Sequence, residues 1–197
     1  MSDDSLKVIL IGESGVGKTC LINVSTGQGF DTNEKATLTA SYLKKSITIN
    51  EISYVICLWD TVGQEKLRNL TKIFFKNSKI VIFVYDITSK RSFEALASWE
   101  KDVKNLLGDN IVKGVVGNKQ DLFMNEEVTE EEGANYANSI NAKFRLVSAK
   151  TDPQSFNVLL EELLKEYLKK NEAVSSNIKL SNKPKNEEEK KKKGGFC

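Results

Sequence analysis

A glycine-rich run ending in lysine and threonine is the strongest chemical signal in this 197-residue sequence. Residues 12–19 read GESGVGKT and fit the pattern G-x-x-x-x-G-K-[ST], in which backbone N–H groups of a glycine loop surround phosphate groups. The lysine of such a loop reaches the β- and γ-phosphates, and the threonine hydroxyl is a ligand of Mg²⁺. The residues expected to contact the nucleotide are Gly12, Ser14, Gly15, Val16, Gly17, Lys18, Thr19 and Cys20. By itself this run predicts only that a nucleoside triphosphate is bound.

Two further polar motifs indicate which base the nucleotide carries. Residues 118–121 read NKQD after an apolar run, and residues 148–150 read SAK. The carboxylate of Asp121 can accept hydrogen bonds from the N1–H and the exocyclic amine of guanine, whereas adenine offers an acceptor at N1. Lys119 can lie along the base, and a backbone N–H of the second motif can reach O6. The expected base-binding residues are Asn118, Lys119, Asp121, Ser148, Ala149 and Lys150. Either motif fits an ordinary polar loop, but both behind a phosphate loop predict a guanine nucleotide, GTP or GDP.

Strands and helices must position these loops, and the signals for the two alternate along the sequence. Short apolar runs predict strands at residues 6–11, 46–49, 53–59, 80–85, 112–117 and 144–147, of which the second and third alternate as a hairpin does. Helical spacing predicts helices from residue 18 and over residues 91–107, 129–140 and 153–170. Thr129 and Glu132 open the third of these as a capping box. This alternation is typical of an α/β fold with a mainly parallel sheet, helices on both faces and a site at the strand ends.

Composition narrows the chemistry further. The chain has no histidine, which removes the usual general base and the imidazole metal ligand. Its cysteines, Cys20, Cys57 and Cys197, are too scattered for a disulfide framework or a zinc site, and the first two are also candidates for core thiols. Residues 1–170 hold 22 basic and 23 acidic side chains, so no nucleic-acid partner is expected.

A fourth motif gives the sequence a resemblance to a known family. Residues 59–65, WDTVGQE, resemble the D-T-A-G-Q-E element of the Ras superfamily of small GTPases, and the likeness runs from about Leu6 to Lys170. It implies a P-loop NTPase small G domain over residues 1–170, with a mostly parallel six-stranded sheet and helices on both faces. It also implies Asp60 and Thr37 as ligands of Mg²⁺ beside Thr19, Gly63 as a γ-phosphate contact, Gln64 as the catalytic residue that orients water, and Phe30 at the guanine edge.

Within that superfamily, the chain is most similar to the Rab family, at residues 85–88, YDIT, and at residues 66–71 and 74–76. The likeness implies a membrane-associated switch of vesicle trafficking that hydrolyses GTP slowly. It implies as partners a guanine nucleotide exchange factor, a GTPase-activating protein, effectors that read the switch loops, a GDP-dissociation inhibitor and a prenyltransferase. The chain is expected to act as a monomer at the cytosolic face of endomembranes and to cycle with the cytosol.

Residues 171–197 are predicted to form a flexible hypervariable tail. They hold seven basic and four acidic residues, and the lysines at 190–193 are followed by GGF and Cys197. A lysine run is most often a solvated tail, but this ending resembles the prenylated tails of Rabs, which makes Cys197 the expected lipid site. One lipid binds a membrane weakly, and the lysine run would supply the second attraction.

Two departures from the family pattern leave alternatives open. Val62 stands where the pattern has alanine, and Thr39 replaces a glycine of the effector segment. The alternatives are a GTP-binding scaffold with impaired hydrolysis, a Ras-like signalling GTPase and an ATP-using P-loop enzyme. Asp121 argues against the last, because a carboxylate does not match adenine. Ras-like tails end in C-a-a-X, a motif that residues 194–197 do not form.

Overall fold

In the computed structural model, the described residues are 5–31, 37, 41–61 and 74–181. The chain divides into two compact units, Met1–Tyr167 and Leu168–Cys197. The first unit contains the sheet and the loops that carry the described candidate residues. In these ranges, none of the helices combines the length and the apolar character needed to cross a bilayer. The functional division into residues 1–170 and 171–197 stays a prediction.

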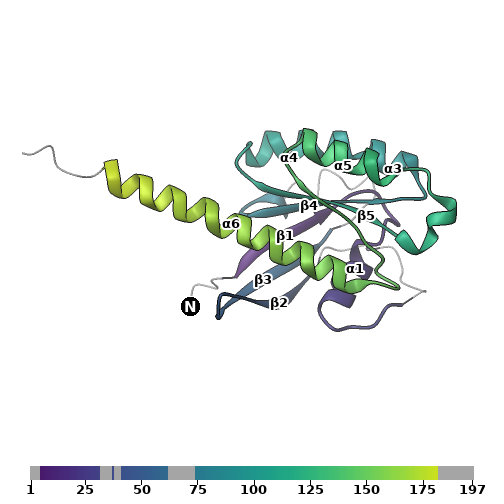
Figure 1. Ribbon diagram of the computed structural model, residues 1–197, viewed down its shortest axis with the longest axis horizontal. Coiled ribbons are helices and arrows are strands. Elements are labelled where there is room, and N and C mark those ends of the chain that lie inside the picture. The colour runs from purple at the N-terminus through teal and green to yellow at the C-terminus, as the bar shows by residue number, and fades with distance from the viewer. Residues whose placement is uncertain (1–4, 32–36, 38–40, 62–73, 182–197) are drawn as a thin grey trace, which may run out of the picture. The chain divides into compact units, whose positions relative to one another are not determined.

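The sheet has six strands in the order β2-β3-β1-β4-β5-β6. The strands are β1 (Leu6–Ile11), β2 (Ser41–Ile49), β3 (Ile52–Asp60), β4 (Ile80–Asp86), β5 (Val112–Asn118) and β6 (Lys143–Leu146). All neighbouring strands run parallel except β2 and β3, which form an antiparallel hairpin. Every residue of β4 and β5 is buried, as in the central strands of a sheet covered on both faces. The predicted six-stranded, mostly parallel sheet is confirmed (Figure 1).

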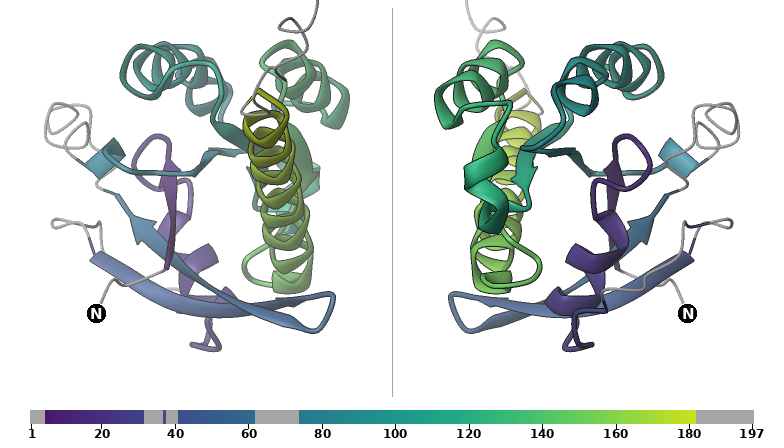
Figure 2. Two further views of the ribbon diagram at one scale, coloured as in Figure 1. Left: turned by 90° about the vertical axis from the view of Figure 1, so that its left-hand side faces the viewer. Right: turned by 90° about the vertical axis from the view of Figure 1, so that its right-hand side faces the viewer.

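Helices cover both faces of this sheet (Figure 1, Figure 2). They are α1 (Lys18–Ser25), α3 (Lys90–Glu94), α4 (Leu96–Leu107), α5 (Glu130–Ser139) and α6 (Pro153–Ser181), with a 3₁₀ helix, η2, at Gln120–Asn125. Helices α3, α4 and α5 pack on one face, whereas α1 and residues 153–167 of α6 pack on the other. The loops that follow the strands therefore emerge between two helical layers.

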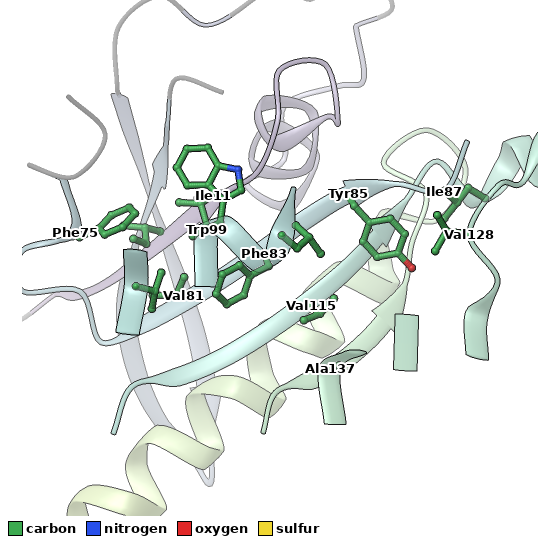
Figure 3. Packing of buried hydrophobic residues seen from close by; sticks show 13 residues of the cluster. Ile11, Phe75, Val81, Phe83, Tyr85, Ile87, Trp99, Val115, Val128 and Ala137 are labelled. Atoms are coloured by element: carbon green, nitrogen blue, oxygen red, sulfur yellow. The ribbon is translucent and has the colours of Figure 1, made fainter. Parts of the chain in front are cut away.

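Alternate positions of β4 build the core beneath α3, α4 and α5. Figure 3 shows Val81, Phe83 and Tyr85 of β4 near Trp99 of α4 and Ala137 of α5. Each of these side chains is at most 1% exposed. Burying a large apolar side chain contributes about 1.5–3 kcal/mol to stability, so this packing holds β4 and its neighbours firmly. The residues at the carboxyl ends of these strands consequently start from well-defined positions.

The hairpin and the capping box that the sequence predicts are both present. The turn of the hairpin has φ values of 49° at Asn50 and 67° at Glu51, and two successive positive values match the twist of paired strands. The Thr129 hydroxyl accepts a hydrogen bond from the Glu132 N–H at 3.2 Å, and Glu132 Oε2 accepts one from the Thr129 N–H at 2.9 Å. The hairpin strand β2 is longer than expected, since it begins at Ser41.

The single helix predicted over residues 91–107 is wrong, because two helices, α3 and α4, occupy this segment. They meet at Ala95, whose carbonyl oxygen accepts hydrogen bonds from the N–H groups of both Ser98 and Trp99, at 3.1 and 3.2 Å. The shorter of these bonds closes a three-residue turn, which is tighter than an α-helical one. The change leaves the buried face of α4 against the sheet.

The predicted end of the last helix at Lys170 is also wrong, since α6 continues to Ser181. Residues 154–181 contain neither proline nor glycine, the two residues that most disfavour helix, and the first proline beyond them is Pro184. Residues 171–181, which the sequence assigned to the tail, are therefore helical.

Candidate nucleotide-binding site

The glycine-rich loop joins β1 to α1 and lies very close to the sheet. Gly12 has a φ of 148°, and a Cβ there would lie 2.1 Å from the carbonyl oxygen of Val84 in β4. Gly17 has a φ of 94°, and a Cβ there would lie 2.3 Å from Nδ2 of Asn118. Each of these glycines has a backbone conformation that residues with a side chain rarely adopt, and a Cβ at either position would clash with a neighbouring atom. The loop geometry therefore requires glycine at both ends.

The lysine of the loop is buried and contacts the loop itself. Lys18 is 5% exposed, and its Nζ donates hydrogen bonds to the carbonyl oxygens of Gly12 at 2.9 Å and Glu13 at 2.8 Å. Burial lowers the pKa of Lys18 to about 8, and the charges of Asp60 and Glu13 oppose this shift. An anion entering the loop would stabilise the ammonium, since opposite charges attract strongly where water is excluded. The loop is thus suited to a phosphate group.

The three predicted metal ligands meet beside this lysine. Asp60 Oδ2 accepts hydrogen bonds from the hydroxyls of Thr19 at 2.7 Å and Thr37 at 3.1 Å, and the two hydroxyls lie 2.8 Å apart. Asp60 Oδ1 is buried and has no hydrogen-bond partner among the described residues. Burial raises the pKa of Asp60, while the two hydroxyls and the charge of Lys18 oppose the change. A carboxylate and two hydroxyls are oxygen donors of the kind Mg²⁺ prefers, and the orphaned oxygen is suited to a water ligand of the ion. These residues therefore fit the predicted metal.

The side-chain amide of Asn118 connects the phosphate loop to the loop after β6. Its Nδ2 donates to the carbonyl oxygen of Val16 at 2.8 Å, and its Oδ1 accepts from the N–H of Ala149 at 3.2 Å. Asn118 is 2% exposed, so losing either partner would leave a buried polar atom unsatisfied. Although 102 residues separate Asn118 from Val16, the sequence motifs form one connected structure.

The hydroxyl of Ser148 holds the carboxylate that is expected to read the base. It donates to Asp121 Oδ1 at 2.6 Å and accepts from the backbone N–H groups of Lys150 at 3.2 Å and Thr151 at 3.0 Å. The hydroxyl therefore orders its own loop and orients the carboxylate at once. The Asp121 carboxylate can accept hydrogen bonds from the N1–H and the amine of guanine, and a backbone N–H group of residues 148–150 can donate one to its O6.

Comparison with known proteins bears directly on this arrangement. The sequence model of the Ras family matches residues 7–169 of the chain. The chain belongs to the Ras family. Similar relatives include Rab-18 of Caenorhabditis briggsae, 38% identical over 175 residues, which are 85% of this chain and 86% of that protein. Rab-18 of Lymnaea stagnalis is 36% identical over 182 residues, which are 90% of this chain and 89% of that protein. Rab-21 of Geodia cydonium is 39% identical over 144 residues, which are 73% of this chain and 63% of that protein.

Membership in the Ras family has direct consequences for chemistry and partners. Members are GTP hydrolases that bind GTP or GDP together with Mg²⁺, and this chain is a GTPase of that kind. Exchange factors, GTPase-activating proteins and effectors are the partner classes that the family brings. The guanine preference and the magnesium ion inferred from the motifs agree with this membership.

Several candidate residues of this Ras-family chain take no part in the contacts above. Ser14 and Gly15 are exposed at the tip of the phosphate loop, Cys20 is half-buried on α1, and Phe30 is 39% exposed on the segment after α1. The candidates outside the described residues are Gly63, Gln64 and Cys197, as are the two departures, Thr39 and Val62. Their roles stay predictions.

Sequence reasoning assigned no site role to Asp86, although this residue of the Ras-family chain reaches the base-binding loop. Asp86 ends β4 in register with Asn118 of β5, and its Oδ2 lies 2.6 Å from Nζ of Lys119. The sequence signal that could have found Asp86 is a carboxylate directly after the apolar run at residues 80–85. Thr61 was missed in the same way: its hydroxyl donates to the carbonyl oxygen of Leu10 at 2.6 Å and ties the end of β3 to β1.

Proposed function

We propose that this chain is a Rab-like GTPase switch, which binds GTP or GDP with Mg²⁺, hydrolyses GTP slowly and acts on membranes in vesicle trafficking. One observation carries the proposal above all others. Asn118 joins the phosphate loop to residues 148–150, where Ser148 holds Asp121. A single ligand that carries both phosphates and guanine would contact the phosphate loop and the base-binding loops at the same time. The relatives named Rab-18 and Rab-21 support the trafficking role.

The side chains of the proposed site position the triphosphate and do not react with it. Lys18 would exchange its two loop carbonyls for β- and γ-phosphate oxygens. Thr19, Thr37 and Asp60 would hold Mg²⁺, which neutralises charge on the phosphate oxygens when bound. Gln64 would orient the attacking water. Catalysis would therefore come mainly from placement and electrostatic stabilisation.

Thr37 and Gly63 are proposed to sense the terminal phosphate. Thr37 belongs to the segment between α1 and β2, and its hydroxyl contacts Asp60 and Thr19. With triphosphate bound, Thr37 would turn to the metal and Gly63 would donate its N–H to the γ-phosphate, so that both segments become ordered. Hydrolysis removes these contacts, and partners that recognise the ordered segments would then dissociate.

Single-turnover hydrolysis tests the proposal. We expect purified, GTP-loaded protein to convert GTP to GDP with a rate constant of order 10⁻⁴ s⁻¹ in the presence of Mg²⁺. Replacing Gln64 with leucine should slow this step roughly tenfold or more, because a misplaced nucleophile loses the benefit of orientation. Quantifying bound GDP against time by chromatography gives both rate constants.

The control and the contrary result are equally specific. Gln154→Leu makes the same change at an exposed position at the start of α6 and should leave the rate constant unchanged. Retention of GTP for days by the unmodified protein would contradict autonomous hydrolysis. It would favour the GTP-binding scaffold, and Val62→Ala would be the first variant to test for restored hydrolysis.

We also propose that residues 171–197 attach the protein to the cytosolic face of endomembranes and let it cycle with the cytosol. The lysines at 190–193 and the terminal Cys197 support this proposal. A single lipid gives weak, reversible binding, and each lysine near an anionic leaflet adds about 1 kcal/mol. The glutamates at 187–189 would oppose part of this attraction. Such a tail implies a prenyltransferase and a GDP-dissociation inhibitor as further partners.

Replacing Cys197 with serine should therefore move the protein from the membrane to the cytosolic fraction without changing its affinity for GDP. The serine cannot carry a thioether-linked lipid, and the lysine run binds weakly when it acts without one. Fractionation of cells that express each variant measures the shift. Cys57→Ser, which alters a buried thiol of β3, is the matched control and should remain on membranes. Equal membrane pelleting of Cys197→Ser and the unmodified protein would refute the lipid role.

A further inference from the structure

We infer that Asp86 is a positioning residue of the base-binding site, because its ion pair with Lys119 holds that lysine ready for the guanine. The inference rests on the proposed function, since it concerns the same site. It gives a physical role to the YDIT motif, which is otherwise explained only by resemblance.

The pair is short and partly removed from solvent. Oδ2 of Asp86 lies 2.6 Å from Nζ of Lys119, and the two side chains are 12% and 34% exposed. A charge-assisted contact of this length is stronger than a hydrogen bond between neutral groups. Partial burial also protects it from the screening that makes exposed ion pairs weak. The lysine is therefore tethered at its charged end.

The carboxylate of Asp86 is itself fixed in orientation. Its Oδ1 accepts hydrogen bonds from the backbone N–H of Thr88 at 2.9 Å and from the hydroxyl of Thr88 at 2.8 Å. The N–H of Asp86 donates to the hydroxyl of Ser92 at 3.0 Å. Figure 3 shows the flanking residues Tyr85 and Ile87 in the buried core. With one oxygen occupied by the following turn, the other is directed at the lysine.

Ordering Lys119 costs free energy in its backbone and in its side chain. Its φ of 67° lies in the left-handed region, which a residue with a side chain seldom adopts. A long side chain also loses much rotational freedom when it is fixed along a base. An ion pair that restricts the side chain before the nucleotide arrives reduces the loss at the binding step, which is how preorganisation raises affinity.

A purely structural role for Asp86 is less consistent with the neighbouring contacts. The ends of β4 and β5 are already joined by a backbone hydrogen bond, in which the N–H of Ile87 donates to the carbonyl oxygen of Asn118 at 3.1 Å. The N–H of Gln120 also donates to the carbonyl oxygen of Val147 at 3.0 Å and anchors the loop from its other side. The loop that carries Lys119 is therefore attached without the ion pair. The main effect of the ion pair is then to position the side chain of Lys119.

GDP dissociation from the full-length protein, followed with a fluorescent GDP in the presence of Mg²⁺, tests the inference through a double-mutant cycle. Asp86→Asn removes the charge but keeps an acceptor oxygen for Thr88, and it should release GDP roughly tenfold faster. Lys119→Met keeps the aliphatic stem and should also accelerate release. In the Lys119→Met background, Asp86→Asn should add nothing, since a residue that acts only through its partner shows no independent effect.

Two control variants separate positioning from stability. Thr88→Val removes the hydroxyl hydrogen bond to Asp86 Oδ1 but keeps the one from the backbone N–H of Thr88, which still orients the carboxylate toward Lys119. It should therefore lower the unfolding temperature and leave GDP release within about twofold of the unmodified rate. Glu162→Gln breaks the ion pair between Arg145 and Glu162, which joins β6 to α6 through side chains that are 32% and 38% exposed, and it should not alter release.

Contrary results are distinguishable from failure of the proposed function. Release by Asp86→Asn at the unmodified rate, or acceleration by Asp86→Asn to the same extent with and without Lys119, would overturn the positioning role while GDP binding stands. If Asp86→Asn does not fold, unmodified GDP release by Lys119→Met would overturn it instead. Absence of GDP binding by the unmodified protein would overturn the proposed function and this inference together.

Discussion

Replacing Gly12 with alanine is expected to lower the free energy of unfolding by about 4 kcal/mol or more and to abolish GDP binding. The new Cβ would lie 2.1 Å from the carbonyl oxygen of Val84, well inside van der Waals contact. Val84 is fully buried in a strand paired on both sides, so its backbone cannot yield. The φ of 148° at Gly12 adds backbone strain. Urea-induced unfolding and titration with fluorescent GDP measure the two effects.

Gly29→Ala is the matched control for this prediction. A Cβ at Gly29 meets no atom within 4 Å, and its φ lies outside the left-handed region. The free energy of unfolding should therefore change by less than about 0.5 kcal/mol, as for surface substitutions in general. Unfolding and GDP affinity of Gly12→Ala that match those of Gly29→Ala would contradict the packing described for the phosphate loop.

Replacing Asp121 with asparagine is expected to reduce the preference for GDP over xanthosine diphosphate (XDP) roughly 10³-fold or more. The carboxylate can accept from both the N1–H and the amine of guanine, whereas an amide offers one acceptor and one donor, which suits the C2 carbonyl of xanthine. Ser148 donates to Oδ1 of Asp121 at 2.6 Å, so an asparagine can keep its oxygen there and turn its amine to the base. Competition of GDP and XDP against fluorescent GDP measures the preference.

Asp109→Asn makes the same chemical change far from the loops that hold the base. Asp109 is exposed and pairs with Lys104 at 3.2 Å, so its replacement should leave the preference for GDP unchanged. An Asp121→Asn protein that still selects GDP as strongly as this control would show that another group reads the base. The connection between Asp121 and guanine would then have to be abandoned.

The nucleotide loops were predictable because their chemistry is local. Residues 12–19 place glycines, a lysine and a hydroxyl within one short loop, and hydrophobic periodicity marks the strand and helix beside it. Helix boundaries were less predictable, as the end of α6 at Ser181 shows. Residues 171–181 mix polar, charged and apolar residue types, a composition that a helix and a flexible tail can share, so composition could not separate the two.

The sequence by itself determined the α/β class, the phosphate loop and the preference for guanine, since each follows from residue types at short spacing. Only the tertiary structure decided which distant residues act together. Asn118 meets Val16 across 102 residues, and Ser148 meets Asp121 across 27. The pairing of Asp86 with Lys119 likewise exists only because β4 and β5 run parallel and in register. Parallel strands bring their carboxyl ends to one edge of the sheet, and no local pattern in the chain records which ends will be neighbours.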